Sequence, residues 1–249
     1  MKRILITRPR SQADDFAEKL RIAGFEPIFF PVIEIRPMEP NAELDQALKN
    51  LAKYDWVVFT SVNAVDIFFA KISPLLLGEG GRVRFAAIGP KTAEALRKYG
   101  VEPSFIPDEY VGETILSGLG DVKDKWILLP RAEIAREELP KSIVKAGGIA
   151  HEIVVYQTLP AEIDKDGLMA LKSGVDVVTF TSASTVENFV AIARKNKLDP
   201  LNLPNNPLFA CIGPVTGQAA REVGFTNIVV AKEYTTEGLI EAISNMETL

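Results

Sequence analysis

Apolar residues along this chain follow two alternating patterns. Short runs of β-branched, leucine and aromatic residues are typical of buried strands, and between them lie segments whose apolar residues recur every three or four positions, as in amphipathic helices. In the first half the patterns predict strands over 4–7, 56–60, 83–88 and 104–106, an extended segment over 26–35, and helices over 11–23, 41–52, 62–71 and 90–99. Strands that alternate with helices predict a parallel sheet covered by helices on both faces.

The second half of the chain repeats the first. The segment Thr-Ser-Val-Asn-Ala-Val at 60–65 returns as Thr-Ser-Ala-Ser-Thr-Val at 181–186, and Ile-Gly-Pro at 88–90 returns at 212–214. Three further pairs share one constant spacing: Arg8 with Arg131, Gly24 with Gly147, and Pro37 with Pro160. A repeat of about half the chain length predicts two similar domains.

The repeat favours an α/β protein with two doubly wound parallel-sheet domains over one large domain. Ligands of such folds bind beyond the carboxyl ends of the strands, so the functional site is expected in a cleft between the domains. The extended segments Pro31–Pro37 and Val154–Pro160 are equivalent in the repeat and bounded by proline, which indicates linkers. The simplest division is 1–123 and 124–249, and an exchange of the first strand-helix unit between the halves stays open.

Composition and charge exclude several classes of protein. No stretch approaches the roughly 20 apolar residues of a membrane span, and the early charges at the N-terminus are unlike a secretory signal, so a cytoplasmic protein is expected. A net charge of −5 without a basic run argues against nucleic-acid binding. Cys211 and His151 are the single cysteine and histidine, which excludes Cys/His zinc sites and histidine-based triads within one chain. Both are interpreted as structural, and no metal site is predicted.

In both halves a strand ends in Phe-Thr-Ser, and the serine begins a helix. The candidate binding residues are Thr60, Ser61, Val62 and Asn63 in the first half and Thr181, Ser182, Ala183 and Ser184 in the second. The serine hydroxyl caps the helix, and backbone N–H groups of the first turn can bind an anion without a lysine. One copy alone favours an ordinary helix cap, whereas two copies directed into one cleft favour ligand binding.

A second device at the strand ends is Ile-Gly-Pro followed by threonine. Glycine turns the chain, and proline occupies the first helical position. The candidate binding residues here are Gly89, Lys91, Thr92, Gly213 and Thr216. Such junctions also occur for purely structural reasons. The chain lacks the Gly-x-Gly-x-x-Gly pattern of dinucleotide sites and has no phosphate loop.

Three polar side chains add candidate chemistry. Arg8 and Arg131 each follow an apolar strand, where a guanidinium can bind a carboxylate through two hydrogen bonds, although a solvated loop arginine explains the position equally well. Tyr156 lies in the second linker, which predicts a place at the hinge of the cleft rather than in a core. At neutral pH its phenol would be a hydrogen-bond donor or weak acid and not a base.

These features together resemble the uroporphyrinogen-III synthase family. The resemblance covers essentially the whole chain: Ile-Thr-Arg-Pro at the N-terminus, Phe-Thr-Ser-x-x-Ala-Val, Ile-Gly-x-x-Thr-Ala, the linker Val-Val-Tyr-Gln-Thr, and second copies of the Phe-Thr-Ser and Ile-Gly blocks. It implies two flavodoxin-like domains joined by a two-stranded connector. Domain one would be 1–36 plus 160–249, and domain two 37–159.

The resemblance also implies a function. The family needs no cofactor and converts hydroxymethylbilane into uroporphyrinogen III, losing water and inverting the last pyrrole ring through a spiro intermediate. It implies a catalytic role for Tyr156, which would donate a hydrogen bond to the departing hydroxyl. The chain is expected to act as a monomer, and a transient contact with hydroxymethylbilane synthase, which delivers the unstable bilane, stays open.

Two other interpretations are kept beside this one. A two-lobed binding or sensor protein without turnover would have a similar cleft and would bind an anion at the same helix ends. A flavin or nucleotide protein is suggested by the doubly wound fold but disfavoured by the missing phosphate loop.

Overall fold

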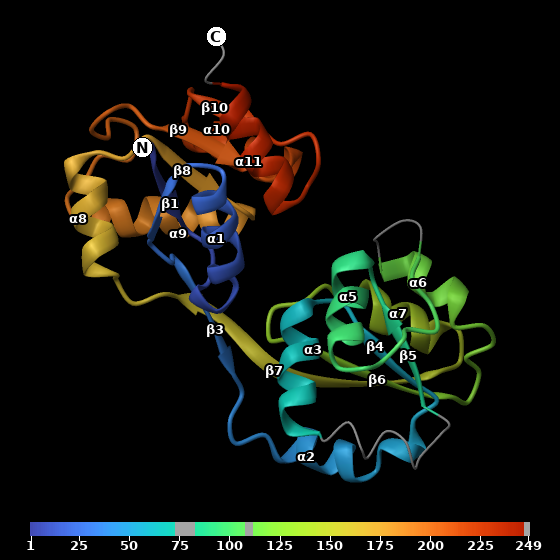
Figure 1. Ribbon diagram of the computed structural model, residues 1–249. Helices are drawn as coiled ribbons and strands as arrows, with labels where there is room; N and C mark the ends of the chain where they lie inside the picture. The colour runs from blue at the N-terminus through green and yellow to red at the C-terminus, as the bar shows by residue number, and fades with distance from the viewer. Residues whose placement is uncertain (73–82, 108–111, 247–249) are drawn as a thin grey trace. The chain divides into compact units, whose positions relative to one another are not determined.

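The computed structural model describes residues 1–72, 83–107 and 112–246, and its chain divides into two compact units (Figure 1). Unit 1 comprises Met1–Glu34 and Leu159–Leu249, and unit 2 comprises Ile35–Thr158. The chain therefore passes from unit 1 to unit 2 once and returns once. In its described residues each unit contains a five-stranded sheet.

Unit 1 is a doubly wound α/β unit. Its elements are β1 (Arg3–Ile6), a 3-10 turn (Arg10–Gln12), α1 (Asp14–Ile22), β2 (Glu26–Phe29), α8 (Lys165–Ser173), β8 (Val177–Phe180), α9 (Ala183–Lys195), β9 (Leu208–Cys211), α10 (Pro214–Val223), β10 (Ile228–Val230) and α11 (Thr236–Asn245). The sheet order is β10-β9-β8-β1-β2, and all neighbours are parallel. Numbered within the unit, this is the order 2-1-3-4-5 of flavodoxin-like folds.

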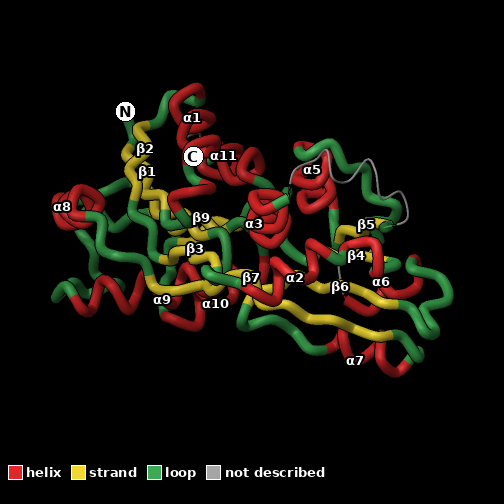
Figure 2. The backbone as a smooth tube through the Cα atoms, turned by 90° about the horizontal axis from the view of Figure 1, so that it is seen from below, coloured by secondary structure: helices red, strands yellow, loops and turns green. Residues whose placement is uncertain are grey.

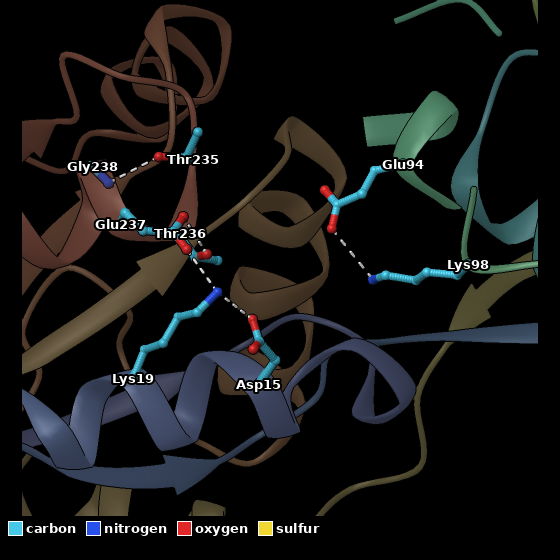
Figure 3. Close-up of polar contacts among 8 residues, drawn as sticks. All are labelled: Asp15, Lys19, Glu94, Lys98, Thr235, Thr236, Glu237 and Gly238. Atoms are coloured by element: carbon cyan, nitrogen blue, oxygen red, sulfur yellow. Dashed lines mark hydrogen bonds and ion pairs between the residues drawn. The ribbon is translucent and has the colours of Figure 1, made fainter. Parts of the chain in front are cut away.

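The strands of unit 1 are buried on both faces because successive side chains point to opposite sides of the sheet. Leu5 belongs to the core beneath α8, α9 and α10, whereas Ile4 and Ile6 belong to the core beneath α1 and α11. Figure 2 shows helices on both sides of the strands. On the second face Lys19 of α1 forms ion pairs with Asp15 at 2.6 Å and with Glu237 of α11 at 2.6 Å (Figure 3).

Unit 2 repeats this plan with a different chain order. Its elements are β3 (Ile33–Pro37), α2 (Ala42–Lys49), a 3-10 turn (Leu51–Lys53), β4 (Trp56–Phe59), α3 (Val62–Lys71), β5 (Arg84–Ala87), α5 (Pro90–Lys98), α6 (Gly112–Gly118), β6 (Trp126–Ala132), α7 (Glu138–Lys145) and β7 (Ile149–Pro160). The sheet order is β3-β7-β6-β4-β5. Counted from β6, the parallel strands β7-β6-β4-β5 follow the same order as β2-β1-β8-β9 in unit 1.

The extra strand β3 runs opposite to β7. Backbone hydrogen bonds join Val32 to Ala161 and Met38 to Val155, so residue numbers rise along one strand while they fall along the other. The crossings between units fall within these two strands, at Glu34–Ile35 and Thr158–Leu159.

The predicted fold class, two similar doubly wound parallel-sheet units, is confirmed. Two predicted extended segments differ in more than their end residues. The extended segment 26–35 forms two strands, β2 and β3, which belong to different sheets. The segment 104–106 makes a single bridge, between Phe105 and Ala86, in place of a full strand.

One pair of repeated residues has the same structural use in both units. The Asp55 carboxylate accepts a hydrogen bond from the backbone N–H of Trp126 at 3.0 Å, and the Asp176 carboxylate accepts one from the N–H of Arg3 at 2.6 Å. Each aspartate thus bonds the first residue of the neighbouring strand. The duplication preserved the contact that aligns the two central strands.

Candidate active site at the strand ends of each unit

The repeated motifs lie at the point in each sheet where the chain order reverses. In unit 1 the central pair is β1 and β8, with Ile6 opposite Thr179, and in unit 2 it is β6 and β4, with Leu128 opposite Val57. Ligands of open α/β sheets bind beyond the carboxyl ends of such a pair. Each unit therefore carries its Phe-Thr-Ser motif at the position where this fold binds ligands.

Side-chain hydrogen bonds hold the central strands of unit 1 together just below the strand ends. Thr7 Oγ1 donates to the Thr179 carbonyl at 2.5 Å, and Thr179 Oγ1 donates to the Leu5 carbonyl at 3.0 Å. Both threonines are fully buried or nearly so. These two hydrogen bonds fix the ends of β1 and β8 relative to each other, and so fix where Arg8 and Thr181 begin the segments that follow the strands.

In unit 1 Ser182 caps α9 in a capping box. Its hydroxyl accepts from the backbone N–H of Thr185 at 3.2 Å, and the Thr185 hydroxyl accepts from the N–H of Ser182 at 3.2 Å. The Ser182 hydroxyl also shares a hydrogen bond of 2.9 Å with the hydroxyl of Ser184. The first-turn amides of Ala183 and Ser184 have no acceptor four residues back in the helix, so they are the donors available to an anion.

In unit 2 Ser61 caps α3, and its surroundings differ from those of Ser182. The Ser61 hydroxyl oxygen accepts from the backbone N–H of Ala64 at 3.2 Å and from the hydroxyl of Tyr156 at 3.1 Å. The structure thus brings together the candidate catalytic tyrosine and one candidate binding serine, which lie far apart in the sequence. Thr60 is exposed, and Val62 and Asn63 are partly exposed on the first turn.

The location expected for Tyr156 is wrong in one respect. Only 6% of Tyr156 is exposed, and its ring belongs to the core cluster that contains Phe59 and Phe68. The register between β6 and β7 shifts here, because Arg131 pairs with Val154 and Ala132 pairs with Tyr156. This bulge turns Val155 and Tyr156 toward the same core, and a bulge of that kind is not visible in the sequence.

The two Gly-Pro junctions have nearly identical geometry. Gly89 and Gly213 precede α5 and α10 with extended backbone, and a proline occupies the first turn of each helix. The Thr92 and Thr216 side chains are only 5% and 4% exposed. If these residues bind a ligand, the backbone amides rather than the hydroxyls are the groups within its reach. Lys91 lies on the exposed side of the first turn of α5.

The two repeated arginines have different surroundings. Arg8 donates to Gln12 Oε1 at 3.0 Å, and its buried Nε has no hydrogen-bond partner among the described residues. Burial lowers the pKa of the Arg8 guanidinium, while the charge of Asp15 opposes this shift. A half-buried guanidinium to which no carboxylate of the described residues is bonded favours an incoming anion.

Arg131, by contrast, already has its partners. It forms an ion pair with Glu152 on β7 and donates to the Arg136 carbonyl at 2.7 Å. Gln12 and Glu152 were not identified from the sequence, because neither the repeat nor a motif marks them. A carboxylate ligand would have to displace Glu152 to reach Arg131.

His151 and Cys211 have the surroundings of structural residues. His151 Nδ1 lies 2.6 Å from the Tyr54 hydroxyl, and its Nε2 lies 3.2 Å from Glu43, at the amino ends of the strands of unit 2. Cys211 is fully buried in unit 1, and burial raises the pKa of its thiol to about 12. Neither residue belongs to the strand-end sites.

The fold and the strand ends define a class: a duplicated flavodoxin-like protein with repeated helix starts at its strand ends and no phosphate-loop motif in its sequence. Among the described residues no group of three or more Cys, His, Asp or Glu side chains could hold a metal ion. No helix in that part of the chain is long and apolar enough to cross a membrane.

Comparison with known proteins identifies the family. A family model described as uroporphyrinogen-III synthase HemD matches residues 14–241. A uroporphyrinogen-III synthase of Synechococcus elongatus is 32% identical over 97% of this chain and 94% of its own length. A putative uroporphyrinogen-III synthase of Methanocaldococcus jannaschii is 31% identical over 98% of this chain and 99% of its own.

Solved structures share the fold. A uroporphyrinogen III synthase of Thermus thermophilus aligns with a TM-score of 0.64 at 22% identity, covering 100% of this chain and 99% of that one. The Helicobacter pylori enzyme aligns with a TM-score of 0.64 at 21% identity, covering 99% and 100%. The chain belongs to the uroporphyrinogen-III synthase family, whose members act in tetrapyrrole biosynthesis. It is therefore an enzyme that catalyses a cyclisation, and a binding protein without turnover is not favoured.

Proposed function

We propose that this enzyme converts hydroxymethylbilane into uroporphyrinogen III, with loss of water and inversion of the last pyrrole ring through a spiro intermediate. The enzyme would be a hydro-lyase that closes a ring and needs no cofactor. The observation that supports this most directly is the occurrence of the same strand-end devices at the order-reversal point of both units. An octacarboxylate substrate needs many anion-binding donors, and repeated helix starts supply them.

Substrate carboxylates are proposed to bind to two kinds of donor. Arg8 supplies a guanidinium whose buried Nε has no partner in the described chain. The first-turn amides of Val62, Asn63, Ala183 and Ser184, and the amides of Gly89 and Gly213 themselves, are neutral donors. Arg131 would contribute less than Arg8, since Glu152 already neutralises it.

The net charge of −5 does not oppose this binding strongly. Screening at physiological salt confines the repulsion to roughly 8 Å, so local contacts decide the affinity. A hydrogen bond to a charged group contributes about 1.5–3 kcal/mol. Several such bonds outweigh the residual repulsion.

Tyr156 is proposed to assist the departure of the hydroxyl group from the substrate. Its hydroxyl is a polar group that the duplication did not copy, since the equivalent residue in the first half is Ile33. Its effect should be modest, because an electron-rich pyrrole expels hydroxide readily. The larger contribution comes from holding the ends of the bilane so that the substituted carbon is attacked.

The experiment incubates the protein with hydroxymethylbilane and separates the uroporphyrinogen isomers I and III. Isomer III should dominate with the enzyme, whereas a mere binder would leave only the spontaneous isomer I. In the same assay Tyr156→Phe should slow isomer III formation by about tenfold, the effect of one lost hydrogen bond of roughly 1.4 kcal/mol. Tyr99→Phe is the matched control, because it removes a tyrosine hydrogen bond, to Asp66 at 3.2 Å, that belongs to no proposed site. An unchanged rate for Tyr156→Phe would remove the tyrosine from the mechanism.

A further inference from the structure

The hydroxyl of Tyr156 lies on the core side of the Ser61 hydroxyl. Tyr156 is only 6% exposed, and its O–H donates to Ser61 Oγ at 3.1 Å. The bulge between β6 and β7 directs the ring into the core of unit 2, so the phenol cannot move outward without unpacking. Ser61 is partly exposed. Of the two residues, Ser61 is the more open to a substrate.

The hydrogen bonds of Ser61 leave one donor unused. Its oxygen accepts from the Ala64 N–H at 3.2 Å and from Tyr156, which together occupy both lone pairs. The Ser61 O–H then has to donate, and no acceptor for it is found in the part of the chain that the structure describes. Because it also accepts from a phenol, this O–H is polarised and is a stronger donor than that of an isolated serine.

The copy in unit 1 lacks this arrangement. There Ser182 is hydrogen-bonded to the Ser184 hydroxyl at 2.9 Å, and Asn63 stands in the place of Ser184 in unit 2. The residue equivalent to Tyr156 is Ile33, which has no hydroxyl. A free donor supported from behind by a buried phenol is therefore a specialisation of the unit 2 copy.

We propose that the Ser61 hydroxyl contacts the departing hydroxyl of the substrate, and that Tyr156 is a positioning residue that acts through Ser61. This inference rests on the proposed function and assigns its donor. Ser61 becomes the catalytic residue in the strict sense, because it touches the reacting atoms. Tyr156 donates a hydrogen bond to the Ser61 oxygen from the side of the core, which leaves the Ser61 proton directed toward the substrate.

The step needs no net proton from the protein. The carbon–oxygen bond of the substrate hydroxymethyl group breaks, and its electron pair leaves with the oxygen. The proton that completes the water molecule comes from the pyrrole N–H of the same ring, which leaves the neutral azafulvene. Ser61 keeps its proton and stabilises the negative charge that develops on the departing oxygen.

The experiment is a double-mutant cycle with Ser61→Gly, Tyr156→Phe and the combined variant, measured by the isomer assay. Glycine removes the hydroxyl but is tolerated at a helix cap at a cost of a few tenths of a kcal/mol. We expect Ser61→Gly to lower kcat by at least as much as Tyr156→Phe, about tenfold or more, with KM changed by less than about threefold. The combined variant should be no slower than Ser61→Gly, because Tyr156 has no route to the substrate without Ser61.

Two further variants separate donation from capping. Ser61→Thr keeps a hydroxyl and a cap and should retain most of the activity. Asp164→Ala removes a comparable cap, the bond from the Gly167 N–H at 2.7 Å, in a part of unit 1 with no proposed role, and should cost stability without slowing the reaction. A normal rate for Ser61→Gly would overturn the proposal, as would a further loss when Tyr156→Phe is added. Absence of isomer III with the unaltered enzyme would instead refute the proposed function itself.

Discussion

Replacing Arg8 by methionine tests whether its half-buried guanidinium is kept for the substrate. Methionine keeps the unbranched apolar stem but removes the charge. In the structure the change removes one bond to Gln12 at 3.0 Å and an Nε that has no partner in the described chain. The lost bond costs about 0.5–1.5 kcal/mol, and relief from burying a charge offsets part of it. The free energy of unfolding should therefore fall by less than about 1 kcal/mol.

The effect on substrate binding should be larger than the effect on stability. A charge-assisted contact of about 1.5–3 kcal/mol corresponds to a rise in KM of about ten- to a hundredfold. The assay is steady-state formation of isomer III over a range of bilane concentrations, with stability measured by urea unfolding. The rise in KM should shrink at high salt, because a charge is removed.

Arg131→Met is the matched control at the equivalent position of the repeat. Because it breaks the ion pair with Glu152 and the bond to the Arg136 carbonyl, it should lower the free energy of unfolding by about 1–3 kcal/mol. Its KM should rise less than that of Arg8→Met. The reasoning is refuted if Arg8→Met is strongly destabilised with an unchanged KM, since Arg8 would then be structural.

Two further predictions concern stability. The hydrogen bond from Lys19 holds the pKa of Glu237 at about 2, below its ordinary 4.5, so this contact stabilises the fold above about pH 4.5 and is lost as the pH falls toward 2. Glu237→Gln should therefore weaken the pH dependence of the free energy of unfolding over that range. The change should be less than about 1 kcal/mol because the pair is exposed. An unchanged pH dependence would contradict the assignment. Gly167→Ala should destabilise unit 1 by about 1–3 kcal/mol, because the new Cβ would overlap the Phe29 carbonyl oxygen, although alanine is the better helix former. Urea unfolding measures the change, and a stabilised variant would refute the close approach.

Local patterns predicted most of the elements because each depends on neighbours in the sequence. The strand predicted over 56–60 is β4 (Trp56–Phe59), and the helix predicted after Ser61 is α3 (Val62–Lys71). The helix predicted over 11–23 begins later, at Asp14, since Arg10–Gln12 forms a 3-10 turn. The split of 26–35 into two strands was missed because periodicity does not show which sheet a strand joins.

In the candidate site, too, the sequence predicted the features that depend on adjacent residues and missed those that depend on distant ones. The repeat located the serine caps and the Gly-Pro junctions, because helix starts depend on a few adjacent residues. It could not distinguish Arg8 from Arg131, whose strands end alike. Their difference lies in Glu152, which reaches Arg131 from the adjacent strand β7.

The amino-acid sequence specified two copies of one α/β plan, the strand ends at which each copy can bind a ligand, and a linker tyrosine, Tyr156, without a counterpart in the first half. Tertiary structure decided which of these groups are available. The bulge between β6 and β7 places Tyr156 in the core, where its hydroxyl donates to Ser61. Arg131 forms an ion pair with Glu152, whereas the buried Nε of Arg8 has no hydrogen-bond partner among the described residues. The physical reason is that capping and turning are local, whereas burial and pairing depend on side chains brought together from distant parts of the chain.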